Sequence, residues 1–173
     1  MGNSGELWVI SPKIFTKSEE GGMPVFIGEY TYSLDEKGRV SIPAKLRDAL
    51  GIDFILTRGL DGCVAAYSLE AWESLSAKIA ALPTAKARDL KRFMFASATQ
   101  VTPDKQGRVL IPSPLRSYAE LEKDVSVIGA NDHVEIWDRD KWEGRRDALT
   151  SDYIADAMDE VGLKATRNTT GMP

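Results

Sequence analysis

The sequence has little of what catalytic and metal sites are usually built from. Its 173 residues include one cysteine, Cys63, and one histidine, His133. A lone cysteine cannot form an internal disulfide, which is typical of a reducing cytoplasm, and zinc sites usually need several Cys or His ligands at close spacing. The sequence has neither a P-loop nor a G-x-G-x-x-G pattern. We therefore expect a binding protein that is not an enzyme and uses no metal, cofactor or small-molecule substrate.

Long apolar runs are also missing. No run approaches the roughly 20 apolar residues that cross a bilayer, and the longest uncharged stretch near the start covers only residues 7–12. We therefore expect no membrane partner and no signal peptide. With 43% hydrophobic and 28% charged residues, the composition is typical of a globular protein with a buried core.

What the chain does contain is an internal repeat. Residues 35–47 match residues 104–116 at eight of thirteen positions, and both segments read Asp-x-x-Gly-Arg-Val-x-Ile-Pro-x-x-Leu-Arg. After a one-residue slip the match continues, with Gly59 aligned to Gly129. One copy of about 45 residues is too small to bury much of a core. The sequence therefore predicts two copies of one module that pack together.

The apolar pattern predicts an α+β fold with the same elements in each copy. The expected strands are residues 26–34, 40–42, 54–58 and 63–67 in the first copy, and 98–101, 109–111, 125–128 and 134–137 in the second. A short helix follows the second strand of each copy, at residues 44–50 and 115–121, and Gly51 ends the first of them. Each copy thus alternates strand pairs with helices.

Longer helices connect and follow the copies, beginning after the expected N-caps Ser68, Thr84 and Asp138. The expected organisation is a flexible N-terminal extension at 1–22, a first module at 27–72, a helical linker at 73–97, a second module at 98–142, and a C-terminal helix with a polar tail at 143–173.

Each copy places a reverse turn between its first two strands. Asp35 and Gly38, like Asp104 and Gly107, stand at the first and fourth positions of a type I turn closed by a glycine bulge. Such a turn needs a left-handed backbone at the glycine. We interpret these four residues as turn-formers, and Asp35 could also orient the arginine after the turn by pairing with it.

The turns also carry cations. Between Asp35 and Arg116 there are 13 Lys and Arg against 9 Asp and Glu, a charge of +4, although the whole chain has −4. The candidate DNA contacts in the exposed turns are Lys37, Arg39, Lys105 and Arg108. An arginine after a turn glycine could be only a solvated strand residue, but its recurrence beside a lysine favours DNA contact. Because one chain offers few phosphate contacts, firm binding would need several turns side by side, which favours an oligomer.

Two further arginines recur in the repeat, on the short helices. Arg47 and Arg116 are candidate DNA contacts, and they could equally pair with a carboxylate at an interface between modules. A last basic group is more typical of the solvated face of a linker helix; it consists of Lys86, Arg88, Lys91 and Arg92.

The paired Asp-x-x-Gly-Arg-Val-x-Ile-Pro blocks resemble those of the MraZ family of bacterial regulators. The similarity covers about residues 26–142, from Phe-Ile-Gly-Glu-Tyr to Asp-x-x-x-Trp. The resemblance implies two swapped-hairpin β-barrel modules of the AbrB and SpoVT type, which form a pseudo-dimer within one chain, and several chains assembled into a ring. In that family the turns that correspond to residues 35–39 and 104–108 are taken to face DNA.

The resemblance also implies a function. It predicts a cytoplasmic, nucleoid-associated transcriptional regulator that binds repeated double-stranded DNA sites upstream of its own division and cell-wall operon, usually as a repressor. A second hypothesis is a ring-forming protein-interaction scaffold, without specific DNA binding, whose turns dock an acidic partner. A third, an enzyme on a small β-barrel, is disfavoured because the sequence offers no pair of nucleophile and base.

Overall fold

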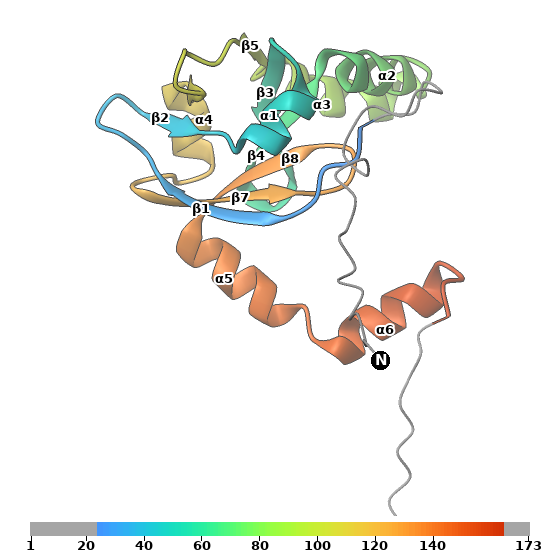
Figure 1. The fold of residues 1–173 in the computed structure, drawn as a ribbon. Coiled ribbons are helices and arrows are strands. Elements are labelled where there is room, and N and C mark those ends of the chain that lie inside the picture. Colours follow the sequence, from blue (N-terminus) through green and yellow to red (C-terminus); the bar gives the residue numbers. More distant parts are fainter. Residues whose placement is uncertain (1–23, 165–173) are drawn as a thin grey trace, which may run out of the picture. The chain divides into compact units, whose positions relative to one another are not determined.

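A computed structural model describes residues 24–164, which divide into two compact units. The first unit ends at Asp138, and the second begins at Arg139, so each is described by itself. The extension expected at 1–22 lies outside the described residues, as does the end of the polar tail. Figure 1 shows the elements, coloured along the sequence.

The elements of the first unit run through the same order twice. The first copy contains β1 (Glu29–Ser33), β2 (Arg39–Ser41), α1 (Ala44–Leu50), β3 (Phe54–Arg58), the 3₁₀ turn η2 (Leu60–Gly62) and β4 (Val64–Ser68). Two helices, α2 (Leu69–Ala80) and α3 (Thr84–Phe95), lead to the second copy, which contains β5 (Thr99–Val101), β6 (Arg108–Leu110), α4 (Ser113–Tyr118), β7 (Asp124–Gly129) and β8 (Val134–Asp138). The predicted α+β class is confirmed.

The strands of the two copies pair crosswise. Six strands form one antiparallel sheet in the order β1-β7-β8-β4-β3-β5, and β2 pairs with β6 in a separate antiparallel ribbon. Exchanging equivalent strands of the two copies reverses this order, which defines a pseudo-two-fold axis between β4 and β8. The first strand of each copy pairs with the third strand of the other, β1 with β7 and β5 with β3. Each copy therefore completes its sheet with strands of the other.

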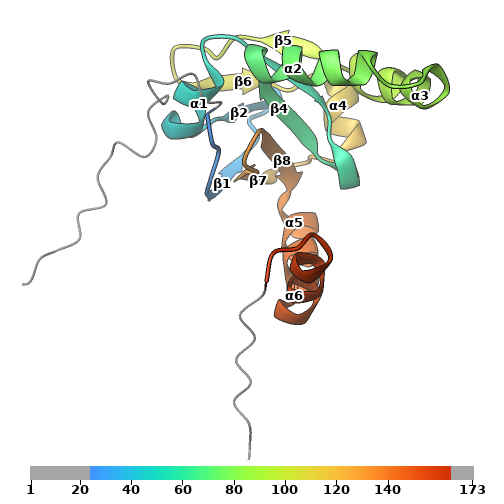
Figure 2. The same ribbon diagram turned by 90° about the vertical axis from the view of Figure 1, so that its right-hand side faces the viewer.

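One hydrophobic core serves both copies. Val40 and Val109 face each other at the centre of the β2–β6 ribbon, and both are fully buried in this core. Helices α1 and α4 lie at opposite ends of the ribbon and contribute Leu46 and Leu115 to the same core (Figures 1 and 2). Because a fully buried aliphatic side chain stabilises by about 1.5–3 kcal/mol, these contacts fix the ribbon between the two helices.

Two predicted boundaries are wrong for reasons of local backbone conformation. The first strand begins at Glu29 and not at Phe26, because Gly28 has a φ of 104° and interrupts the extended chain. Helix α4 ends before the predicted residue 121, because Glu120 has a left-handed φ of 53°. The predicted end of α1 is confirmed by a φ of 93° at Gly51.

The predicted helix caps have different outcomes. Ser68 caps α2, since its Oγ accepts a hydrogen bond of 3.1 Å from the backbone N–H of Ala71. The prediction for Thr84 is wrong: α3 begins at Thr84 itself, Pro83 stands at the N-cap position, and no side chain caps this helix. Proline at this place fixes the backbone angle that leads into the helix.

The predicted alignment of Gly59 with Gly129 is also wrong. In the sheet, Val64 pairs with Arg58 and Val134 pairs with Gly129, so Gly129 occupies the place of Arg58. The loop between β7 and β8 has four residues where the loop between β3 and β4 has five. The second copy therefore has the shorter hairpin loop at this end of the sheet.

The second unit contains two helices, α5 (Arg139–Ala148) and α6 (Ser151–Glu160). In α5, the Nε of Arg139 donates to Oε1 of Glu143 at 3.2 Å, which supports the first turns of the helix. Thr150 caps α6, because its Oγ1 accepts from the backbone N–H of Tyr153 at 3.3 Å. Helix α6 lies where the sequence led us to expect a C-terminal helix.

Candidate nucleic-acid interface

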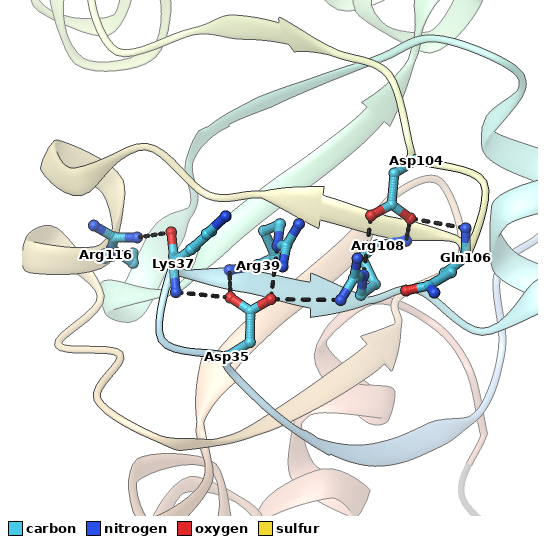
Figure 3. A network of polar contacts seen from close by, with 7 residues as sticks. All are labelled: Asp35, Lys37, Arg39, Asp104, Gln106, Arg108 and Arg116. Carbon is cyan, nitrogen blue, oxygen red and sulfur yellow. Dashed lines mark hydrogen bonds and ion pairs between the residues drawn. The ribbon is translucent and has the colours of Figure 1, made fainter.

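The two Asp-x-x-Gly-Arg turns flank one short ribbon in the fold. The ribbon places Arg39 opposite Leu110 and Arg108 opposite Ser41, so the turns lie at its two ends, and the strand after each turn begins beside the end of the other copy's strand. Figure 3 shows the resulting network, in which side chains of both turns meet across the ribbon. Two segments that lie 69 positions apart in the sequence thus form one surface.

The first turn has the predicted geometry. The backbone N–H of Gly38 donates to the carbonyl of Asp35 at 3.0 Å, and Gly38 has a φ of 79°. The Oδ1 atom of Asp35 accepts from the backbone N–H groups of Lys37 and Arg39, both at 2.9 Å. The carboxylate therefore satisfies two backbone donors inside the turn and keeps it closed.

The second turn repeats this pattern. Gly107 has a φ of 75° and donates its N–H to the carbonyl of Asp104 at 2.9 Å. The Oδ1 atom of Asp104 accepts from the backbone N–H groups of Gln106 and Arg108, both at 2.9 Å. The interpretation of the two aspartates and two glycines as turn-formers is supported by these bonds.

The arginine after each turn pairs with the aspartate that begins it. The Nε of Arg39 lies 2.6 Å from Oδ2 of Asp35, and the Nε of Arg108 lies 2.9 Å from Oδ2 of Asp104. Asp35 also faces the second turn, because Nη1 of Arg108 is 3.7 Å from its Oδ2 atom. Both arginine side chains remain 30% exposed. The guanidiniums are oriented by carboxylates and still reach solvent.

These contacts set the ionisation of the aspartates. The backbone N–H of Arg39 holds the pKa of Asp35 below its usual value, with further contributions from the Arg39 guanidinium and the N–H of Lys37, although desolvation opposes them. The pKa of Asp104 is lowered in the same way, first by the backbone N–H of Arg108. Both carboxylates are therefore ionised at neutral pH, and the arginines stay paired.

The two arginines of the short helices lie against the turns. Nη1 of Arg116 donates to the backbone carbonyl of Lys37 at 3.2 Å, and Nη1 of Arg47 donates to the carbonyl of Ile42 at 3.3 Å. Both side chains are half-buried. These two hydrogen bonds go to backbone carbonyls, whereas the sequence suggested carboxylates as the partners at an interface between modules.

The structure thus gathers all six predicted cations on the two turns or directly beside them. Lys37 and Lys105 are exposed on the turns themselves. The six cations share this surface with the three acidic residues of the turns, Asp35, Glu36 and Asp104, which gives a local charge of +3 in a chain with −4. A polyanion that approaches this surface interacts with the local positive charge, even though the net charge of the whole chain is negative.

Sequence reasoning missed two residues of this site. The backbone N–H of Ile42 donates to the carbonyl of Gly107, and the N–H of Ile111 donates to the carbonyl of Gly38, both at 3.0 Å. Each return strand thus bonds to the turn of the other copy. The Ile-Pro pair recurs in the sequence, but a backbone hydrogen bond between distant segments does not depend on residue type. The sequence therefore could not predict these two bonds.

The other singled-out residues have structural surroundings. Cys63 is fully buried, and burial raises the pKa of its thiol. His133 stacks on Tyr67 with ring centroids 5.2 Å apart and hydrogen-bonds to Asp132 and Glu135. Within residues 24–164, no cluster of three or more His, Cys, Asp or Glu side chains is arranged to hold a metal ion. In the same part of the chain, no helix has the length and apolar character to span a membrane.

Fold and site together define a tandem protein of two intertwined modules that present paired cationic turns. Residues 25–93 and 94–159 each match the family model described as "MraZ protein, putative antitoxin-like". The chain belongs to the MraZ family, as the resemblance predicted.

Curated relatives agree with this assignment. The chain is 52% identical over 143 residues to the transcriptional regulator MraZ of Acetivibrio thermocellus, an alignment that covers 80% of this chain and 100% of that protein. It is 47% identical over 142 residues to the protein of the same name from Clostridium beijerinckii, with 80% and 100% covered. For the one from Pelotomaculum thermopropionicum the identity is 46% over 143 residues, with 80% and 99% covered.

Proposed function

We propose that this protein is a non-enzymatic, sequence-specific DNA-binding transcriptional regulator whose paired turns contact the double helix. The observation that carries the proposal is the pairing itself: two Asp-x-x-Gly-Arg turns flank one ribbon, each with an arginine held by an aspartate. The name shared by the curated relatives, transcriptional regulator, supports the same class.

In this proposal each cation has a separate role. Asp35 pairs with Arg39 through Nε, which leaves the end of the guanidinium with two terminal nitrogens for bidentate contact with a guanine in the major groove. Arg108 is also held through Nε, by Asp104, but its Nη1 faces Asp35 at 3.7 Å, so a bidentate contact by Arg108 would have to draw that nitrogen away from Asp35. Lys37 and Lys105 serve as phosphate contacts, which position the turns without reading sequence. Arg47 and Arg116 complete the set of cations at this interface.

The finer parts of the proposal rest on membership of the family. The sites are repeats in the promoter of the protein's own division and cell-wall operon, and binding represses transcription there. Each pair of modules closes β-barrels, and several chains form a ring that brings many turns to one face. The protein acts in the cytoplasm, on the nucleoid.

The test is binding of the full chain to duplex DNA from upstream of its own gene, measured by fluorescence anisotropy. Arg39→Ala combined with Arg108→Ala should weaken binding by at least about tenfold, since a good bidentate base contact contributes about 1–3 kcal/mol. The matched control is Arg88→Ala with Lys91→Ala, which removes the same charge from exposed positions of α3 and should change affinity little.

Equal losses in the two double variants would contradict a specific role for the turns. Indifference of the unchanged protein to DNA at low salt would overturn the proposal and favour the ring-forming interaction scaffold. Sedimentation of each variant shows whether its assembly is intact, so that lost binding is not confused with lost assembly. Footprinting on the same DNA should show protected repeats at regular spacing.

A further inference from the structure

The turn glycines are buried beneath the arginines of the opposite copy. A Cβ atom placed on Gly107 would lie 1.6 Å from Nη1 of Arg47, and one on Gly38 would lie 1.3 Å from Nη1 of Arg116. Both glycines are buried although the turns project from the ribbon. Each guanidinium therefore rests directly on the α-carbon of the other copy's turn, where only glycine leaves room for it.

Backbone bonds follow the same crosswise pattern. Ile42, of the first copy, donates to Gly107 of the second, and its own carbonyl accepts from Arg47. In the reciprocal backbone contact, Ile111 donates to Gly38, whereas Arg116 differs from Arg47 in donating to the opposite copy's turn itself, at the carbonyl of Lys37. Each turn is thus bonded to one backbone N–H of the opposite copy and has one guanidinium of that copy packed on its glycine.

The helices that hold the two arginines are anchored in the hydrophobic core. Arg47 follows Leu46 on α1, and Arg116 follows Leu115 on α4, and both leucines are buried in the shared core. A planar guanidinium on such an anchored helix can lie flat against a turn and donate in a fixed direction, which a lysine ammonium cannot do. The half-buried position also limits the contact of these two side chains with a phosphate.

We propose that Arg47 and Arg116 are positioning residues, each of which holds the DNA-facing turn of the opposite module. The proposal rests on the proposed function for its role in DNA binding. Its consequence is a crossed dependence: a change on α1 affects the second turn, and a change on α4 affects the first. A direct phosphate contact would produce no such crossing.

The first test uses the full chain without DNA. Amide hydrogen exchange, followed by NMR, compares Gly107 and Arg108 in the second turn with Gly38 and Arg39 in the first. Arg47→Ala removes the guanidinium that packs on Gly107 and that bonds to Ile42, whose N–H binds the Gly107 carbonyl. It should therefore speed exchange about fivefold or more in the second turn and leave the first unchanged. Arg116→Ala should do the reverse. Lys45→Ala, which removes one charge from an exposed position of α1, is the matched control and should affect neither turn.

A conservative variant guards against general loss of structure. Arg47→Lys keeps the charge without the planar group, so it should speed exchange in the second turn while the strands of the sheet keep their protection. Uncrossed effects, equal effects on both turns, or full rescue by lysine would each overturn the proposal.

The second test links the arginines to DNA binding through double variants. If Arg47 acts through the second turn, Arg47→Ala should weaken binding further when added to Arg39→Ala, and should add little to Arg108→Ala. Additive effects with both would overturn the proposal and identify Arg47 as an independent contact. Because the exchange experiment needs no DNA, crossed exchange without any DNA binding would reject the proposed function alone.

Discussion

At the scale of single residues, the two turn aspartates have unequal surroundings although they occupy the same place in the repeat. Asp35 faces both Arg39 and Arg108, whereas Asp104 forms its ion pair with Arg108. Each carboxylate also accepts two backbone N–H groups through Oδ1. Asp35 is therefore the point at which the first turn and the guanidinium of the second are joined.

Replacing each aspartate by asparagine tests this difference. An amide keeps one oxygen for the backbone donors of the turn and removes the charge that the arginines face. We expect Asp35→Asn to lower the thermal unfolding midpoint more than Asp104→Asn. It removes the charge that faces both guanidiniums, whereas Asp104→Asn leaves Arg108 with Asp35 and Arg39 with its own pair. Each variant is the matched control of the other in differential scanning fluorimetry, and equal midpoints would show that the 3.7 Å contact contributes nothing.

His133 gives the first unit a dependence on pH. Burial of the ring favours the neutral form, but hydrogen bonds to Glu135 and Asp132 outweigh it and raise the pKa above the usual value. The pKa is therefore higher in the folded than in the unfolded chain. The resulting stabilisation is fully present below about pH 6.5, the unfolded value, and is lost as pH rises through the folded pKa.

We therefore expect the free energy of unfolding of the unchanged protein to fall, relative to His133→Asn, as pH rises from about 6.5 through the folded pKa. Urea unfolding at several pH values measures this difference directly. Because the sequence contains a single histidine, one imidazole resonance in a proton NMR titration gives the folded pKa independently. A difference between the two proteins that is constant across this range, or grows with pH, would contradict the assignment.

At the scale of elements, the glycine of each turn combines two requirements that can be measured separately. Gly38 and Gly107 have a positive φ, and each also has an arginine guanidinium of the opposite copy packed against its α-carbon. Gly62, in η2, has a φ of 80° with no atom within 4 Å of an added Cβ. Replacing Gly62 by alanine therefore measures only the free-energy cost of a left-handed backbone for a residue with a Cβ.

Alanine at Gly62 should destabilise the protein by about 1–2 kcal/mol, the cost of a left-handed backbone for a residue with a Cβ. Alanine at Gly38 or Gly107 should cost about 1 kcal/mol more, because the arginine must also leave and lose its hydrogen bond. Urea unfolding of the three single variants gives the comparison. Similar losses at all three sites would mean that the arginines shift at no cost.

Whether a feature could be predicted from the sequence depends on how far apart along the chain the residues that form it lie. The turns were predictable, because Asp35 and Gly38 lie three residues apart and form the turn with their own backbone. The contact of Arg47 with Gly107 was not, since sixty positions separate them and an arginine suits a phosphate, a carboxylate or a carbonyl equally well. The wrong prediction of a cap at Thr84 has a local cause, because Pro83 occupies the N-cap position and the helix begins one residue earlier than predicted.

At the scale of the whole molecule, crosswise pairing makes the two copies one folding unit. β1 belongs to the first copy but lies on β7 of the second, and β5 lies on β3 in the same manner. The linker between α2 and α3 passes through an exposed turn at residues 81–83, just before α3 begins. We therefore expect the native strand pairing to survive a break in the chain at this turn.

A protease site inserted at residues 81–83 tests this interdependence. After cleavage, the two halves should elute together in gel filtration under native conditions, with unchanged far-UV circular dichroism, and should separate in urea. The uncleaved protein with the same insertion is the control. Separation under native conditions would mean that the exchanged strands do not hold the copies together.

The salt dependence of DNA binding connects the single chain to the proposed ring. Each phosphate contact contributes a slope of about −0.9 to the logarithm of affinity against that of salt concentration. The six cations of one interface therefore limit a single chain to a slope of about −5.4, and fewer contacts remain if the arginines reach bases.

With the acidic remainder of the chain adding no contacts, firm binding to repeated sites requires several interfaces at once. We expect a slope steeper than about −5.4 for promoter DNA with its full set of repeats, and a slope within that limit for DNA with one repeat, both measured between about 50 and 200 mM salt. Equal slopes on the two DNAs would show that each bound particle uses one interface, so that a ring, if it forms, does not add contacts. Because the two DNAs are compared with the same protein, the difference reports only how many turns act together on one double helix.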